Sequence, residues 1–189
     1  MSGGPGLSPA APVVSDNPDV VRVRPAVEAD IGAVGAIYAH HVLTGTGSFE
    51  ENAPDADEMC ARFRSVTGRG LPYLVADTKG TVRGFAYTAP FRPRSAYRFT
   101  VEDSVYVDPA AVGQGIGRRL LADLIERCRE LGLRQMVAMI GDSDNRRSIA
   151  LHAALGFRPA GTLQRVGCKF GRSLDVVFMQ RSLADDPPA

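Results

Sequence analysis

The chain has 189 residues, with 22 Lys and Arg against 21 Asp and Glu. This length suits a single domain with its own hydrophobic core. The near-zero net charge gives no electrostatic reason to expect nucleic acid or an anionic membrane as a partner, so we expect a small molecule instead. No apolar run approaches the roughly 18 residues of a membrane span, and the first residues lack a basic region followed by an apolar one. We therefore expect a cytoplasmic protein.

Cys60, Cys128 and Cys168 lie far apart in the sequence, are odd in number and show no metal-binding spacing. This pattern suits a reducing cytosol, and we expect each cysteine to fill space in the core. The adjacent His40 and His41 would point to different faces of one helix. We therefore predict no metal site.

The chain begins with a segment rich in Gly, Pro, Ser and Ala that lacks any hydrophobic periodicity. We predict a disordered tail at 1–19, a single domain at 20–183 and a short C-terminal tail at 184–189. Alternating Val and Arg predict a first strand at 20–24. Apolar residues at helical spacing then predict two helices, at 28–42 and 55–66.

Strands at 73–77 and 82–89 are joined by Lys79-Gly80, a typical hairpin turn. With a third strand at 100–107 they should form an antiparallel meander. The loop at 90–99 carries three arginines. Such charges usually face solvent, although a guanidinium can also bind a carboxylate or phosphinate through two parallel hydrogen bonds.

The strand at 100–107 leads into Gly113, Gly115 and Gly117 and then into a helical pattern. The first amides of a helix have no partners inside it, and the helix dipole adds positive charge, so this junction can hold a phosphate. The Lys-Ser or Lys-Thr pair of a P-loop is missing, and the spacing differs from a dinucleotide fingerprint. Taken alone, three alternating glycines would equally suit a tight turn.

The remaining pattern predicts a buried strand at 135–140 that lies beside the strand at 100–107. A helix follows from Asn145 to Leu155 and is closed by Gly156. Strands at 157–166 and 174–181, separated by a loop, complete the domain.

A strand that feeds a Gly-x-Gly-x-Gly turn and an amphipathic helix, followed by Asn145 and SIALHAALGF at 148–157, resembles the GNAT superfamily of N-acetyltransferases. FRPRSAYRFTVEDSVYV at 91–107 and VGCKFGRSLDVVFMQ at 166–180 resemble its phosphinothricin and methionine sulfoximine acetyltransferase branch. The resemblance runs from about residue 21 to 183. It implies a mixed α/β (α+β) GNAT fold: a mainly antiparallel sheet, about four flanking helices, and a parallel strand pair that splays apart to admit acetyl-CoA. It also implies a homodimer.

The resemblance implies an acceptor pocket in which Arg92 and Arg94 hold the acidic end of an amino acid, whereas Arg98 faces solvent. Phe49 would be a wall of this pocket, or alternatively a plug in the core. The substrate-binding residues implied in this way are Phe49, Arg92, Arg94, Tyr97, Glu102, Asp103 and Ser104.

Glu102 lies on a strand that otherwise favours apolar or β-branched residues, so its carboxylate calls for a reason. Partial burial would raise its pKa and make it a better general base, the role that the resemblance implies; the alternative is an exposed strand acid. Asp103 has the opposite strand parity and should face away from it. The resemblance implies that His152 protonates the departing thiolate, whereas a lone helical histidine more often packs or caps.

For the cofactor, the resemblance implies that strand amides bind the pantetheine arm, the glycine turn binds the pyrophosphate and the Asn145 amide binds near the active end. The implied residues are Val105, Tyr106, Val107, Gly113, Gln114, Gly115, Ile116, Gly117, Arg118 and Asn145. Two positions depart from the family pattern: Val112 replaces Gln or Arg, and Ser173 replaces a frequent aromatic residue.

The sequence therefore predicts an acetyl-CoA-dependent N-acetyltransferase that acts by direct attack, without a metal. Phosphinothricin, methionine sulfoximine, methionine sulfone or a similar amino acid would be the acceptor. The alternatives are an acetyltransferase for another small amine or antibiotic, and a non-catalytic acetyl-CoA-binding sensor.

Overall fold

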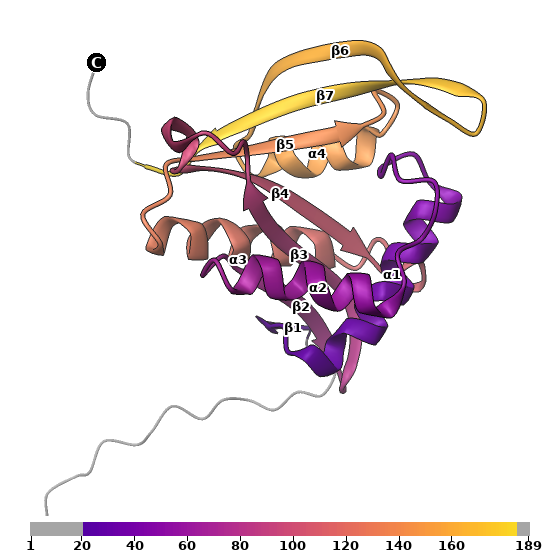
Figure 1. Cartoon of the computed structure of the whole chain (residues 1–189), viewed down its shortest axis with the longest axis vertical. Helices are drawn as coiled ribbons and strands as arrows, with labels where there is room; N and C mark the ends of the chain where they lie inside the picture. Colours follow the sequence, from indigo (N-terminus) through magenta and orange to yellow (C-terminus); the bar gives the residue numbers. More distant parts are fainter. Residues whose placement is uncertain (1–20, 185–189) are drawn as a thin grey trace, which may run out of the picture.

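A seven-stranded mixed sheet with helices on both faces forms the body of the molecule (Figure 1), in the strand order β1-β2-β3-β4-β5-β7-β6. The computed structural model describes residues 21–184, so the predicted tail at 1–19 and residues 185–189 lie outside it. The strands are β1 Arg22–Pro25, β2 Tyr73–Thr78, β3 Thr81–Pro90, β4 Thr100–Val107, β5 Gln135–Gly141, β6 Arg158–Lys169 and β7 Arg172–Ser182. The α-helices are α1 Ile31–Thr44, α2 Ala56–Thr67, α3 Ile116–Glu130 and α4 Arg146–Ala154, and the 3-10 turns are η1 Glu28–Asp30, η2 Ser95–Tyr97 and η3 Pro109–Ala111. The predicted fold class is confirmed.

Strands β1 to β4 form the predicted antiparallel meander, and β5 joins β4 in parallel. The turn between β2 and β3 places Lys79 at φ 54° and Gly80 at φ 78°. Two successive residues with positive φ match the right-handed twist of the flanking strands, which explains the Lys-Gly pair.

The sheet separates two hydrophobic cores. Helices α1 and α2 pack with Tyr73 and Phe85 on one face, while α3 covers the other face with fully buried leucines such as Leu120 and Leu124. Because side chains alternate along a strand, successive residues of β4 belong to different cores. Val101 packs toward α3, and Tyr106 packs toward α1.

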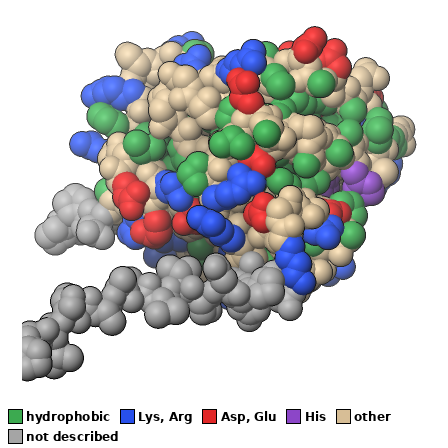
Figure 2. Space-filling view, turned by 90° about the horizontal axis from the view of Figure 1, so that it is seen from below, with side chains coloured by type: hydrophobic (Ala, Val, Ile, Leu, Met, Phe, Trp, Pro, Cys, Tyr) green, Lys and Arg blue, Asp and Glu red, His purple; other side chains and the backbone are tan. Residues whose placement is uncertain are grey.

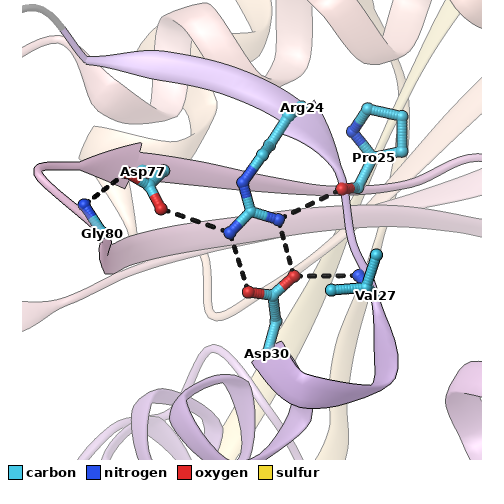
Figure 3. A network of polar contacts seen from close by, with 6 residues as sticks. All are labelled: Arg24, Pro25, Val27, Asp30, Asp77 and Gly80. Carbon is cyan, nitrogen blue, oxygen red and sulfur yellow. Dashed lines mark hydrogen bonds and ion pairs between the residues drawn. The ribbon is translucent and has the colours of Figure 1, made fainter.

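A network of hydrogen bonds between polar side chains holds β1 against β2 at the edge of the sheet (Figure 3). Arg24 on β1 donates two hydrogen bonds to the carboxylate of Asp30, at 2.7 and 2.8 Å, and a third to Asp77 on β2 at 3.2 Å. Asp30 also accepts a bond from the backbone N–H of Val27. The hydrogen bonds from Arg24 hold the pKa of Asp30 below its usual range despite partial burial. This fork-shaped contact fixes the short β1 strand, which has few residues of its own to pair.

The last two strands differ from the prediction. The expected loop at 167–175 is wrong, because β6 and β7 run on to a two-residue turn at Phe170 and Gly171, whose φ values of 52° and 70° suit a tight hairpin. The expectation that Cys168 fills the core is also wrong. Its neighbour Lys169 points inward, so strand alternation turns Cys168 toward solvent.

Positive and negative side chains are interspersed on the face shown in Figure 2, in keeping with the small net charge. Within residues 21–184, every helix is too short or too polar to span a membrane. In the same range, no three His, Cys, Asp or Glu side chains are grouped so that they could hold a metal ion.

Candidate active site

The parallel strands β4 and β5 pair over four residues only, from Thr100 opposite Gln135 to Asp103 opposite Ala138. Beyond that point both strands line one cavity of about 940 Å³, β4 with residues 103–107 and β5 with residues 138–140. The predicted splay is therefore present, and the cavity opens where the sheet loses its internal pairing.

The glycine turn forms one end of this cavity. Gly113 and Gly115 have φ values of 88° and 75°, which residues with a Cβ rarely adopt, and no side chain caps the start of α3. The first amides of α3 are therefore without side-chain partners and carry the positive end of the helix dipole. A Cβ on Gly117 would be in ordinary contact with Leu151 at 3.4 Å and Val107 at 3.5 Å, so α3 begins close to both β4 and α4. These features fit a pyrophosphate group.

The predicted cofactor residues lie mostly together. Those that line the 940 Å³ cavity are Val105, Tyr106, Val107, Gly113, Gly115, Ile116, Gly117, Arg118 and Asn145. Gln114 is not among its lining residues. The backbone N–H of Asn145 donates to Asp142 at 2.9 Å, and its side chain donates to Gly141 and caps α4 through Ser148. The hydrogen bonds of Asn145 thus join β5 to α4.

Glu102 and Asp103 lie on opposite sides of β4, as their parity predicts. Glu102 is half-buried and shares its side with Ser104 and Tyr106. Burial raises the pKa of the Glu102 carboxyl above its ordinary value, with the positive charge of Arg92 opposing this shift and the charge of Asp103 adding to it. A partly desolvated carboxylate of this kind can accept a proton.

Asp103 forms a buried pair with His152 on the cavity side. The two side chains belong to residues that are 6% and 4% exposed, and Nε2 of His152 lies 3.0 Å from Oδ2 of Asp103. Nδ1 of His152 lies 2.7 Å from the carbonyl oxygen of Ser148. Burial lowers the pKa of His152, but the contacts with Asp103 and Ser148 outweigh it and raise the pKa above its usual value. Both ring nitrogens face acceptors, which favours a doubly protonated imidazolium.

Three of the predicted acceptor residues, Arg92, Arg94 and Tyr97, lie apart from His152. Arg92, Arg94 and Tyr97 line a separate cavity of about 280 Å³, together with Arg98. Arg92 lies over the ring of Phe91, 4.3 Å from its centroid.

Ser104 and Asp103 both line the 940 Å³ cavity, whereas Phe49 does not. The Phe49 residue is 38% exposed, and its ring covers the backbone of Gly141 and Gly167. Added Cβ atoms there would lie 2.5 and 2.3 Å from the ring. The interpretation of Phe49 as a residue that plugs the core is therefore wrong, because its ring lies at the surface and packs on the backbone of these two glycines.

Sequence reasoning missed His41 and Lys169. Nε2 of His41 lies 2.8 Å from the carbonyl oxygen of Val107, on the cavity wall. Lys169 is buried near the same cavity. The sequence carried one signal for Lys169. Only two of the 22 Lys and Arg residues are lysines, and the second one, Lys79, lies in a turn.

Comparison with known proteins agrees with this geometry. Residues 36–157 match the acetyltransferase (GNAT) family. The phosphinothricin N-acetyltransferase of Alcaligenes faecalis is 57% identical over 85% of this chain and 82% of its own length. The L-methionine sulfoximine/L-methionine sulfone acetyltransferase of Salmonella typhimurium is 42% identical over 86% and 95%.

Among solved structures, a phosphinothricin acetyltransferase from Sinorhizobium meliloti in complex with acetyl-CoA has a TM-score of 0.83 and 49% identity. The match covers 86% of this chain and 88% of that one. The divergent β4–β5 pair, the uncapped glycine turn and these matches have one explanation: the chain belongs to the GNAT acetyltransferase family.

Proposed function

We propose that this protein transfers the acetyl group of acetyl-CoA to the amino group of phosphinothricin, methionine sulfoximine, methionine sulfone or a similar amino acid by direct attack. The position of Glu102 carries the proposal. Its carboxyl lies one residue before the point where β4 and β5 separate, on the opposite side of β4 from the Asp103–His152 pair. An acceptor on one side can then meet a thioester that enters from the other.

Acetyl-CoA supplies the acetyl group as a thioester, and its pyrophosphate fits the first amides of α3 between Gly113 and Arg118. The strand amides of Val105 and Val107 face the widened gap and would hold the pantetheine arm. Glu102 takes the proton from the acceptor ammonium, directly or through a water. The His152 imidazolium places positive charge and a proton on the side where the thiolate departs.

Arg92 and Arg94 would bind the acidic end of the acceptor. They lie in an exposed arginine-rich loop whose cavity is bordered by the start of β4 at Thr100 and Val101. Guanidinium groups there can form paired hydrogen bonds to a carboxylate or phosphinate. Acetylation of such compounds would confer resistance to them, which is the role we propose.

A homodimer is also part of the proposal. The sheet side formed by β5, β7 and β6 holds an apolar cavity of about 490 Å³ that includes Val137, Phe178 and Leu163. Leu163 is 51% exposed, and nearly all of β6 is exposed. A second copy would cover this surface.

Three free cysteines are consistent with a reducing cytoplasm.

Release of free thiol from acetyl-CoA tests the acceptor class. The panel contains phosphinothricin, methionine sulfoximine, methionine sulfone, glutamate, methionine and a polyamine. We expect turnover of the first three only. Arg94→Ala should raise the acceptor KM by roughly tenfold, whereas the control Arg22→Ala, at an exposed position of β1, should leave it unchanged.

Two results would contradict this function. Turnover of amines without a second acidic or sulfoximine group would favour an acetyltransferase for another small amine or antibiotic. Binding of acetyl-CoA without turnover of any panel member would favour a non-catalytic sensor.

A further inference from the structure

Lys169, the last residue of β6, is a buried cation without an acidic partner. It is 1% exposed, and Nζ donates hydrogen bonds to the carbonyl oxygens of Gly45 at 2.9 Å and Ser48 at 2.7 Å. Within residues 21–184 its ammonium forms no ion pair. The ring of Phe170 lies 5.1 Å from Nζ. The lysine therefore joins the tip of the β6–β7 hairpin to the loop that follows α1 (Figure 1).

Such an arrangement is costly, because a buried ammonium loses its hydration. Burial lowers the pKa of Lys169, and the charges of Glu51 and Glu50 only oppose this shift. A compact ammonium with three donors can satisfy two converging carbonyl oxygens, whereas the flat guanidinium fork cannot be placed there as readily. This explains a lysine in a chain that otherwise uses arginine almost throughout.

The loop that Lys169 holds lines the cavity that contains the predicted cofactor residues. Gly45, Thr46 and Gly47 line the 940 Å³ cavity on the wall that also contains His41. The same loop has a second attachment to the hairpin, because the ring of Phe49 rests on Gly167 of β6. The loop has no helix or strand pairing of its own, and besides these two contacts with the hairpin it is held by the Ser48 and Tyr38 hydroxyls, which lie 3.1 Å apart.

We propose that Lys169 is a positioning residue that fixes the loop at 45–48 as a wall of the 940 Å³ cavity, so that the affinity for acetyl-CoA depends on the β6–β7 hairpin. This inference rests on the proposed acetyl transfer to an amino acid. Lys169 acts through the loop backbone and touches no reacting atom. Arg92 and Arg94, the proposed acceptor-binding residues, line a separate cavity, so the acceptor KM should depend much less on Lys169.

The test is a kinetic comparison of Lys169→Met and Lys169→Gln with the wild-type protein. Methionine keeps the length of the side chain and removes its donors, while glutamine can restore one of the two hydrogen bonds. We expect the Kd for acetyl-CoA, measured by a binding titration, to rise roughly tenfold or more in Lys169→Met and by a smaller factor in Lys169→Gln. The acceptor KM at saturating acetyl-CoA should change by less than about threefold. Thr81→Met, at an exposed position of β3, should behave like the wild type.

An unchanged Kd for acetyl-CoA in folded Lys169→Met would overturn the inference, as would an equal rise in the acceptor KM. Failure of both variants to fold would also overturn it, because the role would then be structural. These results differ from failure of the proposed function, in which the wild-type protein itself would not turn over the acceptors.

Discussion

The neighbouring carboxylates on the two sides of β4 differ in burial and in hydrogen bonding. Asp103 is buried and bonded to His152, whereas the half-buried Glu102 carboxylate has neither a hydrogen bond nor an ion pair within residues 21–184. An unbonded carboxylate with a raised pKa can exchange a proton, whereas a carboxylate that holds a histidine cannot do so without breaking that contact. Strand alternation alone thus assigns the two acids to different tasks.

Replacing Glu102 tests this assignment most strongly. Glu102→Gln keeps the shape of the side chain and removes the base, so kcat should fall by about 10²- to 10⁴-fold. Thermal stability should change little, since no described hydrogen bond of the carboxylate is lost. Steady-state kinetics and a melting curve on the same sample provide the check. A variant with near-normal kcat would show that the base lies elsewhere.

Replacing Asp103 should instead act mainly on stability. Asp103→Asn leaves the buried His152 without its charged partner, at a cost of about 3 kcal/mol in the free energy of unfolding. The raised pKa of His152 means that its contribution is complete below its ordinary value of 6.5 and is lost as pH rises through the folded value. Denaturant unfolding should therefore show the wild type and the variant converging at high pH. A pH-independent difference would contradict the charged pair.

The smallest expected effect concerns Arg92, whose charge opposes the raised pKa of Glu102. The base form of Glu102 is lost as pH falls, so the acidic limb of the kcat/KM profile should lie above glutamate's ordinary 4.5. Arg92→Met removes the opposing charge and should move this limb to higher pH. Rate profiles of both proteins provide the measurement, with Arg98→Met as the control. A shift to lower pH would contradict the assignment of this opposing charge to Arg92.

Much of this arrangement could be predicted from local pattern. The parity of Glu102 and Asp103 follows from the period of a strand, and the glycine turn follows from backbone sterics, so both were visible in the sequence. The pairing of Asp103 with His152 joins residues 49 positions apart and depends on how α4 packs.

The burial of Lys169 was hidden for a similar reason. A lysine at the end of an exposed strand normally faces solvent, and only the distant loop at 45–48 supplies the carbonyl oxygens that hold it inside. The packing of the Phe49 ring likewise needs two glycines from different strands, Gly141 and Gly167. Contacts of this kind are set by tertiary packing, which a local period does not encode.

The early end of the β4–β5 pairing leaves a strand edge inside the protein. After Asp103 the peptide groups on the β5 side of β4 have no strand to pair with. In thermodynamic terms the free protein is an incompletely bonded sheet, and a ligand that lies along this edge completes it. Binding energy then adds to folding energy as RT ln(1 + [L]/Kd), about 2.7 kcal/mol at a hundredfold excess over Kd. The cellular lifetime of this protein would consequently follow the supply of its cosubstrate.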